Sequence, residues 1–213
     1  MLKIRKVTVG PLMTNCYILS SEGDCYIIDA GGNPEKIISE VNEGKLEIRG
    51  IIATHGHFDH ILSVSELQKH FDIPLLINKN EKELINSKKY DPEYFIPGLK
   101  LDMPQKFEYW SGKKELKIGE HIITLMETPG HTPGSSIILG DGFMLTGDTL
   151  FRLSIGRSDI GGNEEDLIKS LKIILSYKEK TRIYPGHGEN SDIRFEILNN
   201  VYIRNILKNG TLY

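Results

Sequence analysis

Residues 54–60 read THGHFDH and place three histidines and one aspartate within seven consecutive positions. The whole chain of 213 residues contains only seven histidines, so this short stretch holds nearly half of them. Imidazole nitrogens and carboxylate oxygens are metal ligands, and together they suit zinc, iron or manganese better than calcium or magnesium. The stretch therefore predicts a binding site for metal ions.

The surrounding sequence predicts how this stretch is held. The apolar strand IRGIIA (48–53) leads into it, and an apolar spacing near 3.6 residues, typical of a helix, follows it. His55 and His57 lie two residues apart in extended chain, so both side chains project to one side and can reach one ion. Asp59 and His60 leave the backbone in other directions and suit a second ion.

Three further candidate ligands follow apolar strands at short turns. His131 lies in TPGHTPG after ITLMET, Asp148 in LTGDTLF after GFML, and His187 in YPGHGEN after RIYP. Glycine beside each candidate lets the backbone approach an ion closely. The isolated histidines His70 and His121 are expected to be surface or core residues instead.

The remaining sequence predicts a single domain over residues 1–213, of the α/β class. Strands followed by helices occur in both halves, which favours two packed sheets with helices outside, a four-layer αββα sandwich. A long excursion over 86–106 is typical of a lid or a binding loop. The expected strands cover 3–9, 14–20, 24–29, 48–53, 73–78, 107–110, 115–118, 121–127, 135–139, 142–146 and 182–185. The main helices cover 34–43, 163–177 and 191–207, with Asn33 as the cap of the first helix.

Composition excludes several classes of protein. The net charge of -3, from 26 basic and 29 acidic residues that are intermingled, provides no basic stripe for nucleic acid. The start of the chain lacks the apolar run of a signal peptide, and no stretch approaches the roughly 18 apolar residues of a membrane span. We therefore expect a cytoplasmic protein without a membrane partner. In that reducing compartment Cys16 and Cys25 are expected to be buried free thiols, although a disulfide between facing strands is an alternative.

Seven motifs occur in an order that resembles the metallo-β-lactamase fold hydrolases, and specifically their glyoxalase II-like branch. These motifs are TNCYIL, IIDAGG, THGHFDH, TPGHTPGS, GDTLF, SIGRSD and PGHG. The resemblance implies the four-layer αββα metallo-β-lactamase sandwich and a site for two divalent ions, with zinc expected and iron or manganese as alternatives. The implied ligands are His55, His57 and His131 for one ion, Asp59, His60 and His187 for the other, and Asp148 bridging both together with a water or hydroxide.

The resemblance also implies roles around the ions. Asp29 in IIDAGG would support the site from behind, and we assign Thr54 to the same supporting shell. Arg152 and Arg157 follow the bridging aspartate and are candidates to meet a substrate carboxylate. For Arg157, an ion pair with Asp159 in its own loop is an equally good interpretation.

The implied activity is hydrolysis of a thioester of a small thiol, of the S-lactoylglutathione type, by metal-bound hydroxide. The enzyme would be similar to a hydroxyacylglutathione hydrolase, with Asp59 and Asp148 as its catalytic carboxylates and a small-molecule thioester as its partner. Dedicated glyoxalase II enzymes add a C-terminal helical domain that holds glutathione, whereas only a short segment follows His187 here. We therefore expect glutathione held loosely or another small thiol, and self-association stays open.

Two other functions remain open from the sequence. Persulfide dioxygenases share this fold and the THGHFDH-type run but use one iron, and SIGRSD partly resembles one of their motifs. A non-catalytic metal-binding module is the third interpretation, although a complete ligand set argues against it. Known β-lactamases with a cysteine ligand, diiron flavoproteins and RNA-processing members fit this chain less well.

Overall fold

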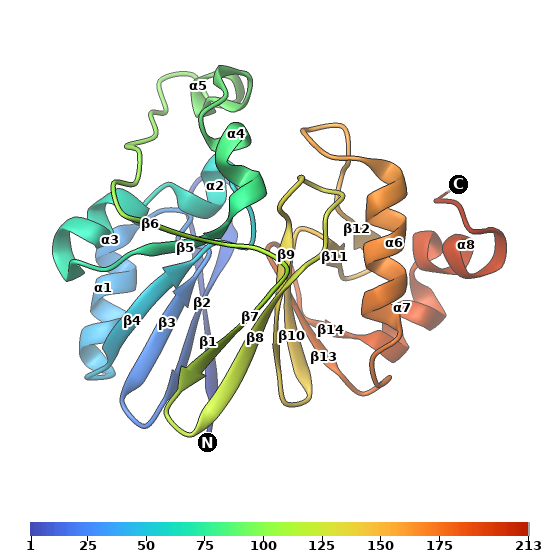
Figure 1. Cartoon of the computed structure of the whole chain (residues 1–213), viewed down its shortest axis with the longest axis horizontal. Coiled ribbons are helices and arrows are strands. Elements are labelled where there is room, and N and C mark those ends of the chain that lie inside the picture. Colours follow the sequence, from blue (N-terminus) through green and yellow to red (C-terminus); the bar gives the residue numbers. More distant parts are fainter. Residues whose placement is uncertain (213) are drawn as a thin grey trace.

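Two six-stranded sheets form the centre of the structure, a computed structural model in which residues 1–212 are described (Figure 1). The first sheet contains, in spatial order, β1 (Lys3–Val9), β2 (Thr14–Ser21), β3 (Asp24–Ile28), β4 (Glu47–Ile52), β5 (Leu75–Asn78) and β6 (Phe107–Trp110). The second contains β14 (Ser191–Asp192), β13 (Arg182–Pro185), β10 (Phe143–Gly147), β9 (Ser136–Gly140), β8 (His121–Glu127) and β7 (Lys113–Ile118). A short ribbon pairs β11 (Leu150–Phe151) with β12 (Ser154–Ile155).

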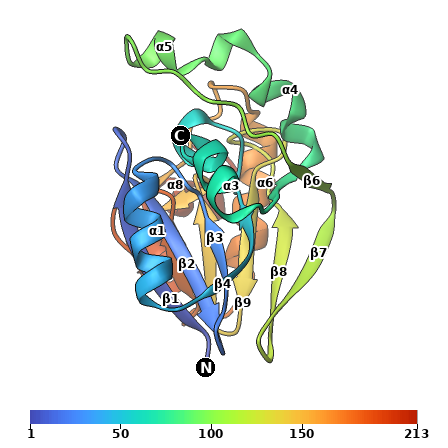
Figure 2. The same cartoon turned by 90° about the vertical axis from the view of Figure 1, so that its left-hand side faces the viewer.

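Helices lie on the outer face of each sheet (Figures 1 and 2). The first sheet is covered by α1 (Pro34–Glu43) and α3 (Val64–Phe71), with the short α2 (Phe58–Ile61) between them in the chain. The second sheet is covered by α6 (Glu164–Leu175), α7 (Ile193–Asn199) and α8 (Val201–Asn209). Between β5 and β6 the chain forms η1 (Lys79–Glu81), α4 (Lys82–Ile85), η2 (Lys88–Tyr90) and α5 (Pro92–Phe95), which extend beyond one end of the sheets.

Alternation within the strands accounts for the four layers. In β2, Ile18 packs in the apolar cluster beneath α1 and α3, whereas its neighbour Leu19 packs in the cluster between the sheets. In β10, Leu145 faces the cluster between the sheets and Met144 faces the cluster beneath α6 and α8. Because neighbouring side chains of a strand point to opposite faces, both sheets are buried on both sides. The predicted four-layer αββα sandwich is confirmed.

Strand direction determines where the candidate ligands lie. β3 and β4 are parallel with Ile28 opposite Ile52, and β10 and β13 are parallel with Gly147 opposite Pro185. The carboxyl ends of parallel neighbours meet at the same edge, so the loops after these four strands lie together. The backbone N–H of Asn15, in the first sheet, donates a 2.7 Å hydrogen bond to the carbonyl of Gly186, after β13. The two sheets are thus joined at the edge that carries the candidate ligands.

Two local predictions need correction. Asn33 has a left-handed backbone, with φ of 48°, and its side chain accepts a hydrogen bond from the Gly10 N–H instead of capping α1. The helix expected over 191–207 is interrupted, because Asn200 adopts an extended backbone and its side chain accepts hydrogen bonds from the N–H groups of Tyr202 and Ile203. Asn200 thus ends α7 and caps α8.

Two other expectations concern membranes and thiols. Among residues 1–212, no helix combines the length and apolar character that crossing a membrane requires. Cys16 and Cys25 are buried free thiols, as expected. Both lie in the apolar cluster beneath α1 and α3.

Candidate metal centre

The loops that follow the strands bring all seven predicted ligands to one place. Within residues 1–212, three overlapping groups of these side chains have ligand atoms within 4.8 Å of one another. The groups are His55 with His57 and His131, Asp59 with His60 and His187, and His55 with His60 and Asp148. The first two groups match the two predicted ligand sets, and the third shows that Asp148 lies where the sets adjoin.

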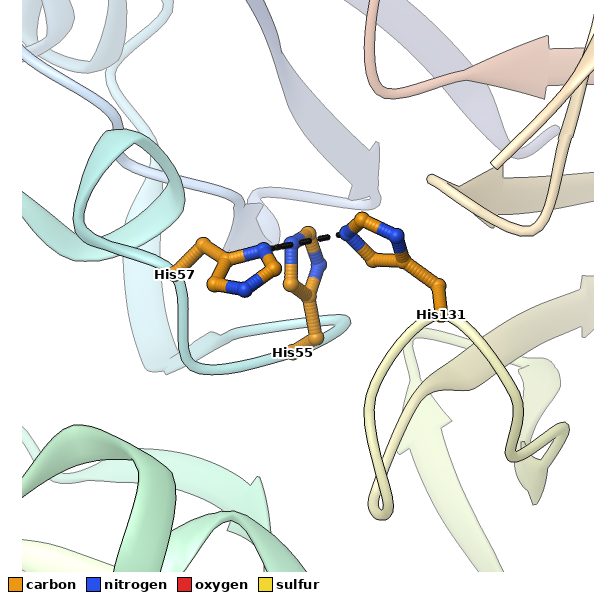
Figure 3. A group of neighbouring side chains, drawn as sticks. All are labelled: His55, His57 and His131. Carbon is orange, nitrogen blue, oxygen red and sulfur yellow. Dashed lines mark hydrogen bonds between the residues drawn. The ribbon is translucent and has the colours of Figure 1, made fainter. Parts of the chain in front are cut away.

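The first set consists of three imidazoles that point toward one another from two loops (Figure 3). Nδ1 of His57 lies 3.0 Å from Nε2 of His55 and 3.0 Å from Nε2 of His131. His55 and His57 come from the loop after β4, and His131 comes from the loop after β8. All three side chains are buried.

The second set adjoins the first through Asp148. Nε2 of His187 lies 3.2 Å from Oδ2 of Asp59 and 3.5 Å from Oδ2 of Asp148. Nε2 of His60 lies 3.4 Å from Oδ1 of Asp148 and 3.6 Å from Oδ2 of Asp59. The same Asp148 carboxylate lies 3.8 Å from Nε2 of His131 in the first set. Asp148 thus lies between the two sets, the position expected for it from the sequence.

Backbone carbonyls fix the orientation of three of the rings. Nε2 of His57 lies 3.0 Å from the carbonyl of Ile160, and Nδ1 of His131 lies 2.7 Å from the carbonyl of Arg157. Nδ1 of His187 lies 3.1 Å from the carbonyl of Leu12. A carbonyl only accepts hydrogen bonds, so in each neutral ring the proton is on this outer nitrogen and the inner nitrogen presents a lone pair.

The other two rings are held by the predicted supporting residues. The hydroxyl of Thr54 donates to Oδ2 of Asp29 at 2.9 Å and lies 3.2 Å from Nδ1 of His55. Nδ1 of His60 lies 3.1 Å from the same Asp29 oxygen. Asp29 and Thr54 thus lie behind the cluster, where Thr54 orients the inner nitrogen of His55 toward it and the Asp29 carboxylate lies beside the outer nitrogen of His60.

This arrangement fits metal ions because it leaves lone pairs of nitrogen and oxygen atoms without a hydrogen-bond donor. The lone pairs of His57 Nδ1 and His131 Nε2 face each other at 3.0 Å, an unfavourable contact unless a cation lies between them. In the second set, Nε2 of His60 and Oδ1 of Asp148 are buried and have no hydrogen-bond partner. Buried polar atoms without a partner cost free energy, and a divalent cation can bind nitrogen and oxygen atoms of this kind. The cluster is suited to a binuclear metal site.

The electrostatics of the two sets differ. Burial lowers the pKa of His55 well below its ordinary value, and burial together with His131 lowers the pKa of His57 to about 4. Neutral imidazole is the form that binds metal. Burial also lowers the pKa of His60, but the carboxylates of Asp148, Asp29 and Asp59 outweigh it and hold that pKa well above the ordinary value. The first set is therefore neutral, whereas the second holds the charged groups of the site. These are the carboxylates of Asp59 and Asp148 and the imidazoles of His60 and His187, since nearby carboxylates raise the pKa of His187 as well.

One glycine permits the close approach of the last ligand loop. A Cβ on Gly186 would lie 2.2 Å from Oδ1 of Asp148 and 2.8 Å from Cε1 of His60. No side chain fits at this position without displacing two candidate ligands. The requirement explains the residue before His187 in the PGHG motif.

A cavity of about 240 Å³ opens onto both sets. Its lining includes four of the predicted ligands, namely His57, Asp59, Asp148 and His187. The rest of its wall is Leu12, Phe58, Tyr90, Phe95, Ile160 and Arg157. Tyr90 and Phe95 belong to the 86–106 excursion, which thus contributes to the wall of the candidate active site.

The two predicted substrate arginines differ in their placement. Arg157 lines the cavity, and its guanidinium donates two hydrogen bonds, of 2.8 and 2.6 Å, to the carboxylate of Asp159. Arg152 is not among the lining residues. Its guanidinium lies 4.2 Å from the ring centre of Phe195 and 3.3 Å from Glu189.

Several residues of the site lie outside the sequence-based prediction. The cavity residues Leu12, Tyr90, Phe95 and Ile160 lie outside the motifs, and Phe58 lies within THGHFDH without being one of its candidate ligands. Glu81, whose carboxylate contacts two ligand loops, lies in a charged stretch that is typical of an exposed helix. The aromatic residues of 86–106 were the one available signal, since that segment was expected to be a lid or binding loop.

Comparison with curated proteins identifies relatives that span almost the same length. A probable metallo-hydrolase of Bacillus subtilis, YqgX, is 36% identical over 199 residues, covering 92% of this chain and 94% of the relative. The hydroxyacylglutathione hydrolase GloC of Haemophilus influenzae is 29% identical over 214 residues, covering 95% and 98%.

Comparison with solved structures agrees with the sequence relatives. The B3 metallo-β-lactamase BLEG-1 superposes with a TM-score of 0.87 at 29% identity, covering 94% of this chain and 99% of that one. TTHA1623, solved in a di-iron-bound form, superposes with a TM-score of 0.83 at 30% identity, covering 92% and 98%.

The family profile described as "Metallo-beta-lactamase superfamily" matches residues 9–187, a range that includes every predicted metal ligand. Together with the sandwich fold and the two adjoining ligand sets, this match identifies the chain as a member of the metallo-β-lactamase superfamily.

Proposed function

We propose that the protein is a metal-dependent hydrolase of the glyoxalase II-like branch, which cleaves a thioester of a small thiol. The observation that carries this proposal is the cavity whose floor includes residues of both ligand sets, so that one bound molecule reaches both. Support comes from the similarity to GloC, a hydroxyacylglutathione hydrolase. The proposed ions are zinc, with iron or manganese as alternatives.

The residues of the site would hold the proposed ions and keep the ligand side chains in place for this reaction. When bound, a pair of divalent ions supplies Lewis acidity, which lowers the pKa of water and polarises a carbonyl. The carbonyls of Ile160, Arg157 and Leu12 hold the three rings of His57, His131 and His187, so these rings do not need to reorganise during turnover. In this proposal Asp59 and Asp148 contribute negative charge at the floor of the cavity.

The apolar wall supports a substrate with an uncharged arm. Phe58 and Phe95 pack with ring centres 5.7 Å apart, and Tyr90 lies beside His57 with ring centres 5.9 Å apart. These rings would exclude water from one side of a bound thioester and contact an acyl chain or the methylene groups of the thiol. The carbonyl carbon would then lie over the ligand cluster.

The charges around the cavity support a small thiol over one that needs several ion pairs. Among the described residues of the cavity lining, Arg157 is the one arginine or lysine, and Asp159 already occupies its guanidinium. A glutathione moiety carries two carboxylates, and only one of them could meet Arg157, at the cost of its pair with Asp159. We therefore propose that recognition depends on the thioester and the adjoining apolar groups.

The main alternative is oxidation of a persulfide at a single iron. The di-iron-bound form of TTHA1623 is the observation that favours iron in a similar site. Against the alternative stands the second set, Asp59, His60 and His187, because a mononuclear reaction has no need for a further complete set of ligands.

A panel of three assays on one metal-loaded preparation tests the proposal. The assays are hydrolysis of S-lactoylglutathione followed by thiol release, oxygen consumption with glutathione persulfide, and hydrolysis of a chromogenic cephalosporin. We expect thioester hydrolysis to dominate and to continue without oxygen. The proposal is wrong if oxygen consumption or cephalosporin hydrolysis exceeds thioester hydrolysis in kcat/KM.

A further inference from the structure

Glu81 is a fully buried carboxylate, 0% exposed, that is not part of the ligand cluster. It ends η1, directly after β5, at the start of the segment that carries Tyr90 and Phe95. Its Oε2 accepts a 2.6 Å hydrogen bond from the backbone N–H of Gly56. Gly56 lies between two histidines of the first set, in what we call the first ligand loop (residues 54–60).

The other oxygen of the same carboxylate holds the second ligand loop (residues 128–134), which carries His131. Oε1 of Glu81 accepts hydrogen bonds from the Thr132 hydroxyl at 2.8 Å and from the Gly134 N–H at 2.5 Å. Ser135 completes the connection, since its hydroxyl accepts from the Thr132 N–H at 3.0 Å and lies 2.7 Å from the Thr132 hydroxyl. One carboxylate therefore joins the two loops that supply the first ligand set.

The hydrogen-bond partners of Glu81 favour its ionised form. The two backbone N–H groups can only donate, and the Thr132 hydroxyl donates in this arrangement, so both carboxylate oxygens act as acceptors. Burial raises the pKa of Glu81 above its ordinary value, and the hydrogen bonds from Thr132, Gly56 and Gly134 offset only part of that rise. A buried charge is tolerated where charge-assisted hydrogen bonds replace water.

The second ligand loop packs closely against Glu81 at Gly134. A Cβ on Gly134 would lie 2.8 Å from both Cγ and Oε1 of Glu81. A residue larger than glycine at position 134 would therefore displace the Glu81 side chain or the loop. Displacement of the carboxylate would break its hydrogen bonds to the two ligand loops.

We propose that Glu81 is a positioning residue whose ionised carboxylate fixes the distance between the two ligand loops and thereby sets the affinity of the first ligand set for its metal ion. The histidines of this set lie on different loops, and their inner nitrogens converge at 3.0 Å only while the loops keep this spacing. The proposal requires that the cluster binds metal, and it holds whatever the substrate is.

The substitution Glu81→Gln tests the proposal with little change of volume. An amide presents one acceptor and one donor, so its NH₂ group must face the N–H of Gly56 or the donors of Thr132 and Gly134. One ligand loop then meets a donor where it needs an acceptor. We expect the zinc dissociation constant of the metal-free protein, measured by competition with a chromophoric chelator, to rise about ten- to a hundredfold.

Glu196→Gln is the matched control. Glu196 is likewise 0% exposed, and its Oε2 accepts hydrogen bonds from the Leu153 N–H and the Asn200 side chain, each at 2.9 Å, but it contacts neither ligand loop in the described structure. Both variants should lower the unfolding midpoint of the metal-free protein. Only Glu81→Gln should change zinc affinity. Equal loss of zinc affinity in both variants, or unchanged affinity in Glu81→Gln, would overturn the proposal.

If Glu81→Gln fails to fold, two less disruptive substitutions at Thr132 test the same proposal. Thr132→Val removes one of the three donors to the carboxylate, whereas Thr132→Ser keeps the hydroxyl. We expect weaker zinc binding in Thr132→Val, because residues that support metal ligands contribute to metal affinity. In Thr132→Ser we expect zinc binding within about twofold of that of the parent protein. Indistinguishable zinc affinities for the two variants would contradict the role of Glu81.

Discussion

Asp29 and Thr54 are joined by two hydrogen bonds: the backbone N–H of Thr54 donates to Oδ1 at 2.8 Å, and its hydroxyl donates to Oδ2 at 2.9 Å. Since the hydroxyl proton is used in this way, the Thr54 oxygen remains an acceptor for Nδ1 of His55, 3.2 Å away. The pair thereby fixes which nitrogen of His55 carries the proton. The other nitrogen faces the cluster with a lone pair.

Thr54→Val should weaken metal binding without abolishing the fold. Valine keeps the shape but removes the hydroxyl, so His55 loses its acceptor and Asp29 loses one of its two hydrogen bonds from residue 54. We expect metal affinity to fall about ten- to a hundredfold, as for other outer-shell partners of metal-bound histidines. Chelator competition measures the change. Thr54→Ser keeps the hydroxyl and serves as the control, and a loss of affinity as large in Thr54→Ser as in Thr54→Val would contradict this role.

His57→Ala should lower the metal content and abolish turnover while the protein stays folded. The nitrogen that His57 contributes lies at the centre of the first set, within 3.0 Å of both of its partners. Three apolar clusters hold the two sheets and the helices independently of the ligands. Elemental analysis and circular dichroism check the two parts of the prediction. Global unfolding of this variant at room temperature would show that the metal is structural.

His187→Ala tests whether the second ligand set is needed for hydrolysis. We expect kcat/KM for a thioester to fall by about a hundredfold or more. Loss of a residue that only supports a metal ligand costs up to about a hundredfold in activity, and loss of the ligand itself should cost at least as much. His70→Ala is the matched control, because His70 is an exposed histidine on α3 that lies outside the cluster. Full activity in His187→Ala would mean that one ion suffices.

The features of this protein that can be predicted from the sequence are those that depend on a pattern within a few consecutive residues. β1, β8 and the RIYP strand β13 match their expected residues, because apolar alternation along a strand reflects burial directly. The candidate ligands were equally visible, since histidine and aspartate at strand ends with glycine beside them form a pattern within a few residues. The parallel pairing of β10 and β13 then brings Asp148 and His187 together.

The unpredictable part depends on contacts between distant segments. The carbonyls that orient His57, His131 and His187 belong to the backbone and leave no trace in the sequence. Glu81 lies in KNEKEL, whose charges suggest an exposed helix, and only the approach of two loops from both sheets buries it. Side-chain chemistry of this kind becomes visible only in three dimensions.

The two cysteines should be unreactive in the folded protein. Burial raises the pKa of the Cys16 thiol far above its ordinary value and that of Cys25 to about 12, so almost no thiolate is present at pH 8. We expect Ellman's reagent to modify neither thiol in the native state and both after unfolding in guanidinium chloride. Rapid modification of the native protein would contradict the burial of β2 and β3.

A thioester whose thiol part lacks the charged groups of glutathione should be hydrolysed almost as well as S-lactoylglutathione. The lining of the cavity includes a single guanidinium, held by Asp159, so the carboxylates of glutathione have little to bind. We expect kcat/KM for S-lactoyl-N-acetylcysteamine to lie within about tenfold of that for S-lactoylglutathione, the equivalent of one modest ion pair. A loss of a thousandfold would indicate a glutathione site beyond the cavity described here.

A metal titration of the metal-free protein under anaerobic conditions tests the central claim most directly. Zinc is added in steps, bound metal is measured by elemental analysis, and thioester hydrolysis is followed by thiol release. Because the ligands form two adjoining sets that share Asp148, we predict that activity continues to rise until close to two ions are bound per chain, and that manganese also supports it. Activity that is complete with one ion per chain, or that iron supports and zinc and manganese do not, would contradict the account.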